Sequence, residues 1–422
     1  MRVLAILYCY PPLLVPASIC YLKVVAALRA RGVDVEILTI TPDSFDSPGR
    51  IPLDPSLSTV IPDGVAHHSV RSPETRFLVK AIKRLDRRRR FTYRWLEPKK
   101  REWLGPARRF LATQDLDRFD VVLSCSQPHA NHLLGQEIAR EAGLPWVAYF
   151  SDPWTDSPYQ TFGSDAVRAF HLELEDSIHR DADRVLFTCE EMREMVVGRH
   201  AALSNEKTGV LPHAFVSDWY PPREPRGEGG VFRILQTGSF YGPRTPEPLI
   251  EALLAIGSPH ELVGRVKIES YGGMDPRHRQ RIVAEGLEEV FVTHGFIPYL
   301  ETLQLMRSHD ALILIDAPLT STDESVFLPS KLVDYLGSGT PVIAVTPEHG
   351  ATARVVREAG GRICALERPA ELQGVLADII RGGGVETSPL AEGIAPFELR
   401  AVGSSLVDTL QAAIDDRSGS VR

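Results

Sequence analysis

The sequence predicts an α/β protein built from two doubly wound domains. Short apolar strands alternate with helical segments along the first half, and the pattern restarts after a break rich in proline, glycine and charge. A chain of 422 residues is also too long for one ordinary hydrophobic core. Apolar residues make up 43% of the chain and charged residues 24%, as in a soluble globular protein. We therefore expect two parallel sheets, each covered by helices on both faces.

The first domain is expected to span residues 1–211. Residues 18–31 have helical periodicity and end at Arg31-Gly32, and the strand VDVEILTI follows, which completes a βαβ unit. The predicted strands of this domain are Arg2–Tyr8, Val33–Ile40, Asp120–Cys125, Pro145–Phe150, Arg184–Phe187 and Thr208–Leu211.

The second domain is expected at residues 231–385, after a linker over 212–230 that is rich in proline, glycine and charge. Its predicted strands begin at Phe232, Val266, Val290, Ala311, Pro341 and Gly361. Residues 386–422 form a terminal segment, in which 397–414 have helical periodicity and the last residues are frayed.

The N-terminus and the cysteines indicate a cytoplasmic protein. The apolar run after Arg2 resembles a signal peptide, but Pro11-Pro12 interrupts it and Ile19 is a poor residue before a lipoprotein-type cleavage. The five cysteines are scattered without metal-ligand spacing, which favours a reduced protein without disulfides. No apolar run reaches the length of a membrane span.

The stretch LPSKLVDYLGSGTPVIAV, from Leu328 to Val345, is central to the second domain. We expect a helix that begins after Pro329, with Ser330 as its N-cap, and ends at residues 337–339, where glycine permits a positive φ. A short apolar strand follows. Such a loop-to-helix turn presents backbone N–H groups and the positive end of a helix dipole, which suits a phosphate.

Two side chains of this stretch are candidates for ligand contacts. Lys331 is expected to face the phosphate, and Asp334 to accept hydrogen bonds from a ribose diol. The alternative is an ordinary helix-to-strand connection, because Gly-x-Gly-Thr-Pro before a strand is also found in such connections.

The same residues resemble the nucleotide-sugar motif of retaining GT-B glycosyltransferases of the family-four (group 1) type. In that family an acidic residue lies just before a helix ending in Gly-x-Pro and an apolar strand, and Asp334 matches the second of two glutamates separated by seven residues. The first of these positions holds Val326, so only the second role is carried over. The resemblance implies two Rossmann-like domains that face a central cleft, with a C-terminal helix crossing back to the first domain.

The segment QTGSFYGPRTPEPLIEAL is similar to the family's Gly-Arg…Lys-Gly loop that holds the diphosphate. The arginine position holds Ser239 and the lysine position holds Arg244, and Lys331 is expected to supply the missing cation. The alternative for Arg244 is a surface turn beside Pro243. His294 closes a strand where contacts to the nucleobase are expected. The residues assigned to donor binding are Gly238, Ser239, Arg244, His294, Pro329, Ser330, Lys331 and Asp334.

In the first domain, PWVAYFSDPW is similar to the strand ending in Asp-Pro-Trp of a bacterial envelope-polysaccharide subgroup. The carboxylate of Asp152, at the carboxyl end of this strand, is expected to orient the acceptor hydroxyl or take its proton. Its alternative role is the N-cap of a helix that begins at Pro153. The motif YPP from Tyr10, followed by a helix, resembles the family's acceptor loop. Acceptor contacts are assigned to Pro12, Ala17, His129, Asp152 and Trp154, and catalysis to Asp152, Arg244 and Lys331.

No metal site and no cofactor are expected, since the resemblance makes the nucleotide diphosphate sugar a co-substrate. Asp181-Ala182-Asp183 has the letters of a metal-binding Asp-x-Asp motif, but the family carries a similar sequence without metal before a strand. His129 and His132 follow a strand and share one helical face, yet two histidines without a third ligand are poor evidence for zinc.

A basic stretch from Arg71 to Arg109 departs from the α/β pattern. It holds fifteen Lys or Arg against four acidic residues, a net charge of +11 in a chain whose formal charge is −8. Interleaved Trp95, Trp103 and Leu104 predict amphipathic basic helices. One interpretation is attraction to anionic lipid or a phosphorylated acceptor, with peripheral attachment to the inner membrane face. The other is a solvated helical face. Nucleic acid is disfavoured because the whole chain is acidic.

The function implied by the resemblance is a retaining, metal-independent glycosyltransferase of the hexosyltransferase type. It would move a sugar from a nucleotide diphosphate sugar to a hydroxyl of an envelope glycan, a lipid-linked acceptor or a small molecule. Two alternatives stay open: a nucleotide-sugar 2-epimerase of similar fold, and a non-catalytic relative that binds sugar nucleotides, which is suggested by Val326 and Ser239 in place of family residues.

Overall fold

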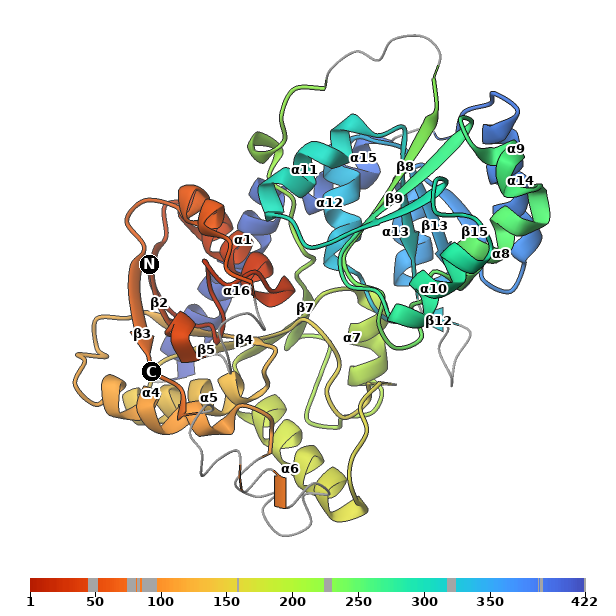
Figure 1. Cartoon of the computed structure of the whole chain (residues 1–422). Helices are drawn as coiled ribbons and strands as arrows, with labels where there is room; N and C mark the ends of the chain where they lie inside the picture. Colours follow the sequence, from red (N-terminus) through yellow and green to blue (C-terminus); the bar gives the residue numbers. More distant parts are fainter. Residues whose placement is uncertain are drawn as a thin grey trace. The chain divides into compact units, whose positions relative to one another are not determined.

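The structure is a computed structural model, which describes residues 1–44, 52–73, 81, 84–85, 97–157, 159–223, 230–316, 324–385, 387 and 390–420. The chain divides into two compact units (Figure 1). The first unit comprises Met1–His213 and Leu399–Arg422, and the second comprises Ala214–Glu398. The boundary therefore falls inside the segment expected to be a linker. Phe215 explains why: its backbone N–H donates to the carbonyl of Phe397 at 2.9 Å, within the second unit.

The described part of the first unit contains a sheet of seven parallel strands in the order β3-β2-β1-β4-β5-β6-β7. The strands are β1 (Arg2–Ile6), β2 (Asp34–Ile40), β3 (Ala66–Val70), β4 (Val121–Ser126), β5 (Trp146–Phe150), β6 (Arg184–Phe187) and β7 (Thr208–Val210). Its α-helices are α1 (Pro16–Ala30), α4 (Leu104–Leu111), α5 (Ala130–Ala142), α6 (Asp165–Asp181), α7 (Glu190–Val197) and α16 (Leu399–Ser420). Helices α1 and α16 pack together, and α5 packs between α4 and α6 (Figure 1).

The described part of the second unit contains six parallel strands in the order β10-β9-β8-β11-β13-β15. They are β8 (Phe232–Thr237), β9 (Val266–Tyr271), β10 (Phe291–His294), β11 (Ala311–Ile315), β13 (Val342–Thr346) and β15 (Arg362–Ala365), beside a small sheet of β12 (Glu324–Ser325) and β14 (His349–Gly350). The α-helices are α8 (Glu247–Ile256), α9 (Pro259–Leu262), α10 (Pro276–Ala284), α11 (Tyr299–Ser308), α12 (Ser330–Ser338), α13 (Ala351–Glu358), α14 (Pro369–Ile380) and α15 (Ala391–Ile394). Short 3-10 helices lie at Pro42–Ser44, Pro55–Val60, Arg101–Trp103, Ser217–Trp219 and Ala395–Phe397.

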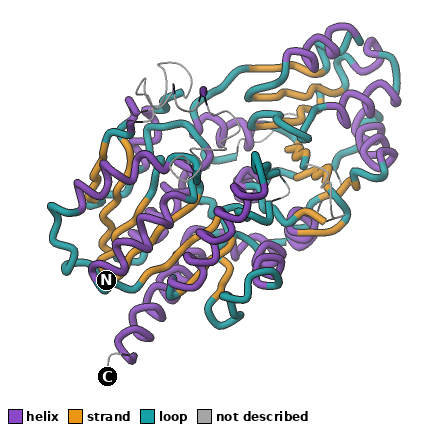
Figure 2. The backbone as a smooth tube through the Cα atoms, turned by 90° about the horizontal axis from the view of Figure 1, so that it is seen from below, coloured by secondary structure: helices purple, strands orange, loops and turns teal. Residues whose placement is uncertain are grey.

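The predicted fold class is confirmed. Figure 2 shows the parallel strands of each sheet running side by side among helices. In both sheets the first strand lies between the second and the fourth of its unit, which is the doubly wound order with a switch point beside the first strand. The central strands β1, β4, β5, β11 and β13 are almost entirely buried, as the apolar runs predicted. Strand β3 was missed because AHHSV, at the sheet edge, is mostly exposed and carries no apolar run.

The terminal helix α16 returns to the first unit, as the resemblance implied. It packs along α1 and reaches strands β4 and β5. The close approach takes place at Gly403, where an added Cβ would lie 2.6 Å from the carbonyl oxygen of Ala27. Only glycine allows the two helix backbones to come so near.

We expect Gly403→Ala to lower the free energy of unfolding by about 1–3 kcal/mol, because the new methyl group must push α16 away from α1. Denaturant unfolding measures the change. Gly419→Ala is the matched control on the same helix, since nothing lies within 4 Å of its added Cβ. The close-approach argument fails if the two variants unfold at the same denaturant concentration.

The start of helix α12 corrects one expectation. The N-cap is Pro329, which makes no side-chain capping bond, and Ser330 is already the first helical residue. The cause is the fixed φ of proline, which places the extended residue one position earlier than a serine cap would. The predicted glycine end is confirmed, because Gly339 has φ +69° in the left-handed region.

Most of the basic stretch lies outside the described residues, so its membrane role stays a prediction. Within the described part, Trp103 and Leu104 are buried in the first unit and do not form an apolar face for lipid. Arg108 pairs with Glu137 of α5 at 2.6 Å. No helix in the described ranges is long and apolar enough to cross a membrane. All five cysteines are free thiols.

Candidate functional site

Part of the set assigned to donor binding, Gly238, Arg244 and Lys331, lies at the carboxyl ends of β8 and β11, which are adjacent strands at the switch point of the second sheet. Gly238 follows the last residue of β8, and Lys331 is the second residue of α12. Tyr335 of α12 fixes this arrangement, because its hydroxyl accepts a hydrogen bond from the backbone N–H of Thr237 at 2.8 Å. The helix start is thereby held against the end of the strand.

Arg244 closes an exposed turn that begins at Tyr241, as its alternative expected, but its side chain points into the unit. Its side chain is 15% exposed, and its Nη2 atom lies 3.1 Å from Oδ1 of Asp316, which is 1% exposed. The other guanidinium arm donates to the hydroxyl of Tyr241 at 2.7 Å. The guanidinium is thus held in a fixed orientation at the strand ends.

Lys331 lies in the same cluster. Its Nζ donates to the carbonyl of Thr237 at 3.3 Å, and among the described residues this is its one hydrogen bond, so further N–H donors are left for a ligand. Burial and the nearby charge of Arg244 lower the pKa of Lys331 to about 8, against the opposing effect of Asp316. Two cations beside one carboxylate leave a local charge of about +1, which favours an anion.

Asp316 is the residue of this cluster that the sequence analysis missed. Besides Arg244, its carboxylate accepts hydrogen bonds from Ser325 at 2.9 Å and from Thr352 at 2.8 Å. A buried carboxylate with these partners is an anchor that positions Arg244. A signal was present in the sequence, because Asp316 directly follows the apolar strand ALILI at the edge where ligands bind in parallel sheets.

Ser239 lies in the loop after β8, whereas His294 is the last residue of β10, two strands away in the sheet. The hydroxyl of Ser239 accepts the backbone N–H of Gly273 at 3.0 Å. His294 stacks on Tyr271, with ring centroids 4.2 Å apart and an interplanar angle of 11°. The carbonyl of Tyr271 in turn accepts the N–H of Gly238 at 2.8 Å. Ser239 therefore organises the loop, and its role toward a donor stays a prediction, as does that of His294.

Asp334 has a different environment from the one expected. Its side chain is 5% exposed, and one carboxylate oxygen accepts a hydrogen bond from Tyr299 of α11 at 3.0 Å. Tyr299 therefore already donates a hydrogen bond to the carboxylate that was expected to bind a ribose diol. The assignment to the ribose stays a prediction.

In the first unit, Asp152 lies in the loop after β5. Its Oδ2 accepts hydrogen bonds from Ser151 at 3.0 Å and from Gln127 at 3.3 Å. The helix-capping alternative is wrong, because the next helix in the described chain, α6, begins at Asp165 and is capped by Ser164. Asp152 is thus a half-buried carboxylate at the carboxyl edge of the sheet, held by two neutral donors.

His129 and Trp154 form a stacked pair beside this loop. Their ring centroids are 4.4 Å apart at an angle of 8°, and Trp154 donates to Nδ1 of His171 at 2.7 Å. Burial, aided by His171, lowers the pKa of His129 to about 3, so its ring is neutral at pH 7. His132 is bound inside the unit by Ser124 at 2.8 Å. Trp154 is only 2% exposed, so the pair packs inside the unit. The acceptor roles of His129, Trp154, Pro12 and Ala17 stay predictions.

Residues 18–213, which lie within the first unit, match the model of the glycosyl transferase 4-like domain. None of the curated proteins matches the chain in sequence.

Solved structures match the chain over both units. Sucrose-phosphate synthase from Thermosynechococcus elongatus has a TM-score of 0.61 at 14% identity, covering 100% of this chain and 98% of that one. HepE from Anabaena, in complex with UDP and glucose, has a TM-score of 0.65 at 15% identity, covering 98% and 100%. WaaG, a glycosyltransferase involved in lipopolysaccharide biosynthesis, has a TM-score of 0.57 at 14% identity, covering 99% and 100%. These likenesses show that the chain has the two-unit GT-B fold.

Proposed function

We propose that the protein is a retaining glycosyltransferase that moves a hexosyl group from a nucleotide diphosphate sugar to a hydroxyl acceptor. The observation that carries the proposal is the Arg244, Lys331 and Asp316 cluster at the switch point of the second sheet, in a chain with a glycosyl transferase 4-like domain. Structural relatives of this fold include HepE, whose complex holds UDP and glucose. A nucleotide diphosphate sugar therefore fits best as the donor.

The chemistry requires stabilisation of a diphosphate leaving group. As the bond between the sugar and the diphosphate breaks, negative charge accumulates on the phosphate oxygens, and fixed cations lower the energy of that state. Arg244 contributes a rigid guanidinium because Asp316 and Tyr241 hold it. Lys331 contributes an ammonium group at the start of α12, where backbone N–H groups add to the positive potential. No divalent cation is assigned to the phosphates.

Asp152 is proposed to serve the acceptor. A carboxylate at the carboxyl edge of the first sheet can orient an acceptor hydroxyl and take its proton during transfer. The stacked His129 and Trp154 rings pack inside the unit and support this loop. We propose as acceptor a glycan, a lipid-linked sugar or a small molecule with a free hydroxyl.

A two-stage experiment tests the function. A thermal-shift panel of UDP, GDP, ADP and TDP identifies the nucleotide, because a ligand that binds only the folded state raises the melting temperature. The matching sugar nucleotides are then incubated with and without acceptors, in EDTA and in Mg²⁺, well below the unfolding temperature. Transfer with an unchanged anomeric configuration and equal rates in both buffers supports the proposal. An isomeric sugar formed without acceptor would identify an epimerase instead, and binding without any transfer a non-catalytic relative.

Nucleotide affinity should fall as the pH rises through the pKa of Lys331. The lysine carries its charge below about pH 8 and loses it above, so the free protein must take up a proton to bind a diphosphate at higher pH. Between pH 7.5 and 9.5 we expect the dissociation constant to rise roughly tenfold. Calorimetric titration with the identified nucleotide diphosphate measures this.

Lys331→Arg is the control for that titration. An arginine stays charged across the range, so the variant reports the titration of the nucleobase and of all other groups. The difference between the two pH profiles belongs to Lys331 alone. Parallel profiles for the native protein and the variant would mean that Lys331 does not face the diphosphate.

A further inference from the structure

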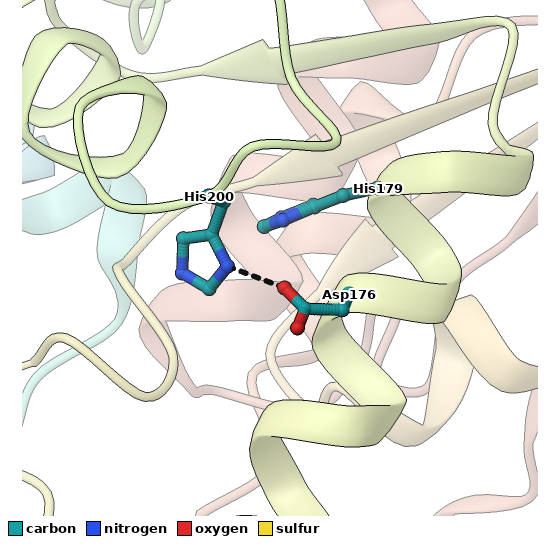
Figure 3. Close-up of side chains that lie close together, drawn as sticks. All are labelled: Asp176, His179 and His200. Atoms are coloured by element: carbon teal, nitrogen blue, oxygen red, sulfur yellow. Dashed lines mark hydrogen bonds and ion pairs between the residues drawn. The ribbon is translucent and has the colours of Figure 1, made fainter.

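A second cluster of titratable side chains lies in the first unit, outside the residues assigned to transfer. Asp176 and His179 are one turn apart on α6, and His200 follows α7. Figure 3 shows the three side chains pointing toward one another, two from the helix and one from the neighbouring turn. Nδ1 of His200 lies 2.7 Å from Oδ1 of Asp176, and one ligand atom from each residue lies within 4.8 Å of the others.

His179 is the unexplained member of this cluster. Its side chain is fully buried, at 0% exposure, and neither ring nitrogen has a hydrogen-bond partner among the described residues. Burial lowers the pKa of His179 to about 3, so the ring is neutral and one nitrogen carries an available lone pair. A buried polar group without a partner is unfavourable, and native proteins rarely retain one without a ligand or a water.

The surroundings of His200 match the outer shell of a metal site. Its Nε2 atom lies 3.1 Å from the carboxylate of Asp156, and Asp156 accepts a second hydrogen bond from Arg199 at 3.0 Å. Glu175 lies 4.0 Å from the same nitrogen. A ligand histidine that donates its other ring N–H to a carboxylate is the usual arrangement around bound metals, because the carboxylate fixes the ring and raises its basicity.

We propose that Asp176, His179 and His200 bind a divalent transition-metal ion of the zinc class. Two imidazoles and one carboxylate suit this class, whereas Mg²⁺ and Ca²⁺ prefer oxygen ligands only. In binding, the metal replaces the proton between Nδ1 of His200 and Asp176, and that proton leaves to the solvent. Asp176 is 43% exposed while His200 is 2% exposed, so water has access to a fourth position on the Asp176 side.

The geometry requires small movements only. Tetrahedral zinc with bonds of about 2.0–2.2 Å holds its ligand atoms roughly 3.3–3.5 Å apart. The ligand atoms in the cluster are up to 4.8 Å apart. Each atom of the most distant pair therefore has to move by about 0.7 Å toward the other, and rotation of the side chains allows this. The bound ion would tie α6 to the turn after α7 and, through Asp156, to the loop after β5. The site does not depend on the proposed transfer function.

The site was not visible in the sequence because its ligands come from separate elements. Asp176 and His179 give only an Asp-x-x-His pair on one helical face, and His200 is supplied by the segment beyond the next strand and helix. Sequence spacing was therefore uninformative, and the packing of α6 against the segment after α7 brings the third ligand in.

Titration of the metal-stripped full-length protein with Zn²⁺ tests the proposal. We expect saturable binding of one ion per chain, a higher melting temperature, and release of about one proton, measured by calorimetry in buffers of different ionisation enthalpy. Co²⁺ in the same site should give the intense visible absorption of tetrahedral coordination. The proposal is overturned if zinc binding does not saturate, or if the Co²⁺ spectrum shows six-coordinate ions alone. The three side chains would then form an ion-pair cluster without a metal.

Variants locate the bound ion. Asp176→Asn changes a partly exposed side chain and should weaken Zn²⁺ binding at least tenfold without unfolding the protein, and His179→Gln should abolish the thermal shift. Asp156→Asn removes the outer carboxylate and should weaken binding about 10- to 100-fold. Asp165→Asn, an exposed carboxylate at the start of the same helix, is the matched control and should bind as the native protein does. Equal zinc affinity in Asp176→Asn and the control would place the ion elsewhere and refute the site.

Discussion

Replacing either Arg244 or Lys331 with alanine should lower the rate of sugar transfer by about 2–4 kcal/mol of barrier, which is a fall of roughly 30- to 1000-fold. Each residue is proposed to stabilise charge that develops on the diphosphate only as the sugar departs. When an interaction that forms only in the transition state is lost, kcat falls, whereas the loss of a ground-state interaction changes KM. Steady-state kinetics with the identified donor separate these two effects.

The two variants should differ in their effect on stability. Arg244→Ala removes the guanidinium that pairs directly with the buried carboxylate of Asp316, which is unfavourable, whereas Lys331→Ala removes a charge that burial already disfavours. Thermal unfolding of both variants must therefore accompany the kinetics. Arg277→Ala is the matched control in the same unit, because its side chain is 71% exposed and pairs only with Asp275 among the described residues. Full activity in a folded Arg244→Ala or Lys331→Ala variant would exclude that residue from the donor site.

The fold was predictable because its strands are buried on both faces. Runs such as ALILI and PVIAV are apolar throughout, and the helices between them show the 3.6-residue period, so the alternation identifies a parallel sheet. The elements that escaped prediction carry no such signal. Strand β3 is an edge strand with exposed histidines, and its pairing with β2 depends on the tertiary fold. The start of the second unit was missed because Phe215 is fixed by a contact with Phe397, far along the chain.

The candidate site was predictable only in part, because sequence identifies residue types and not their partners. Lys331 and Arg244 were placed together by a resemblance, and the structure brings them into one cluster through Asp316. Asp334 shows the limit of that reasoning. Its position in a motif gives no information about Tyr299, which comes from a helix 35 residues away in sequence and occupies one of its oxygens.

Asp152→Asn should separate the two halves of the reaction. The substitution keeps the size and shape of the side chain but removes the negative charge, so the proposed proton acceptor is lost while the donor cluster in the second unit is untouched. We expect transfer to fall about a hundredfold or more, with the dissociation constant of the nucleotide unchanged within about twofold. Calorimetry with the nucleotide and a transfer assay on the same preparation measure both quantities.

The control for this variant is Ser151→Ala, which removes one hydrogen bond to Asp152 but leaves its charge in place. Because Gln127 still donates to the carboxylate at 3.3 Å, this variant should lose at most severalfold in rate.

A further discriminating measurement is the pH dependence of transfer. If Asp152 takes the proton, the acidic limb of the native rate profile should flatten in Asp152→Asn, because the titrating base is gone. Loss of nucleotide binding in Asp152→Asn would instead place this residue in the donor site, and unchanged transfer would remove it from the chemistry.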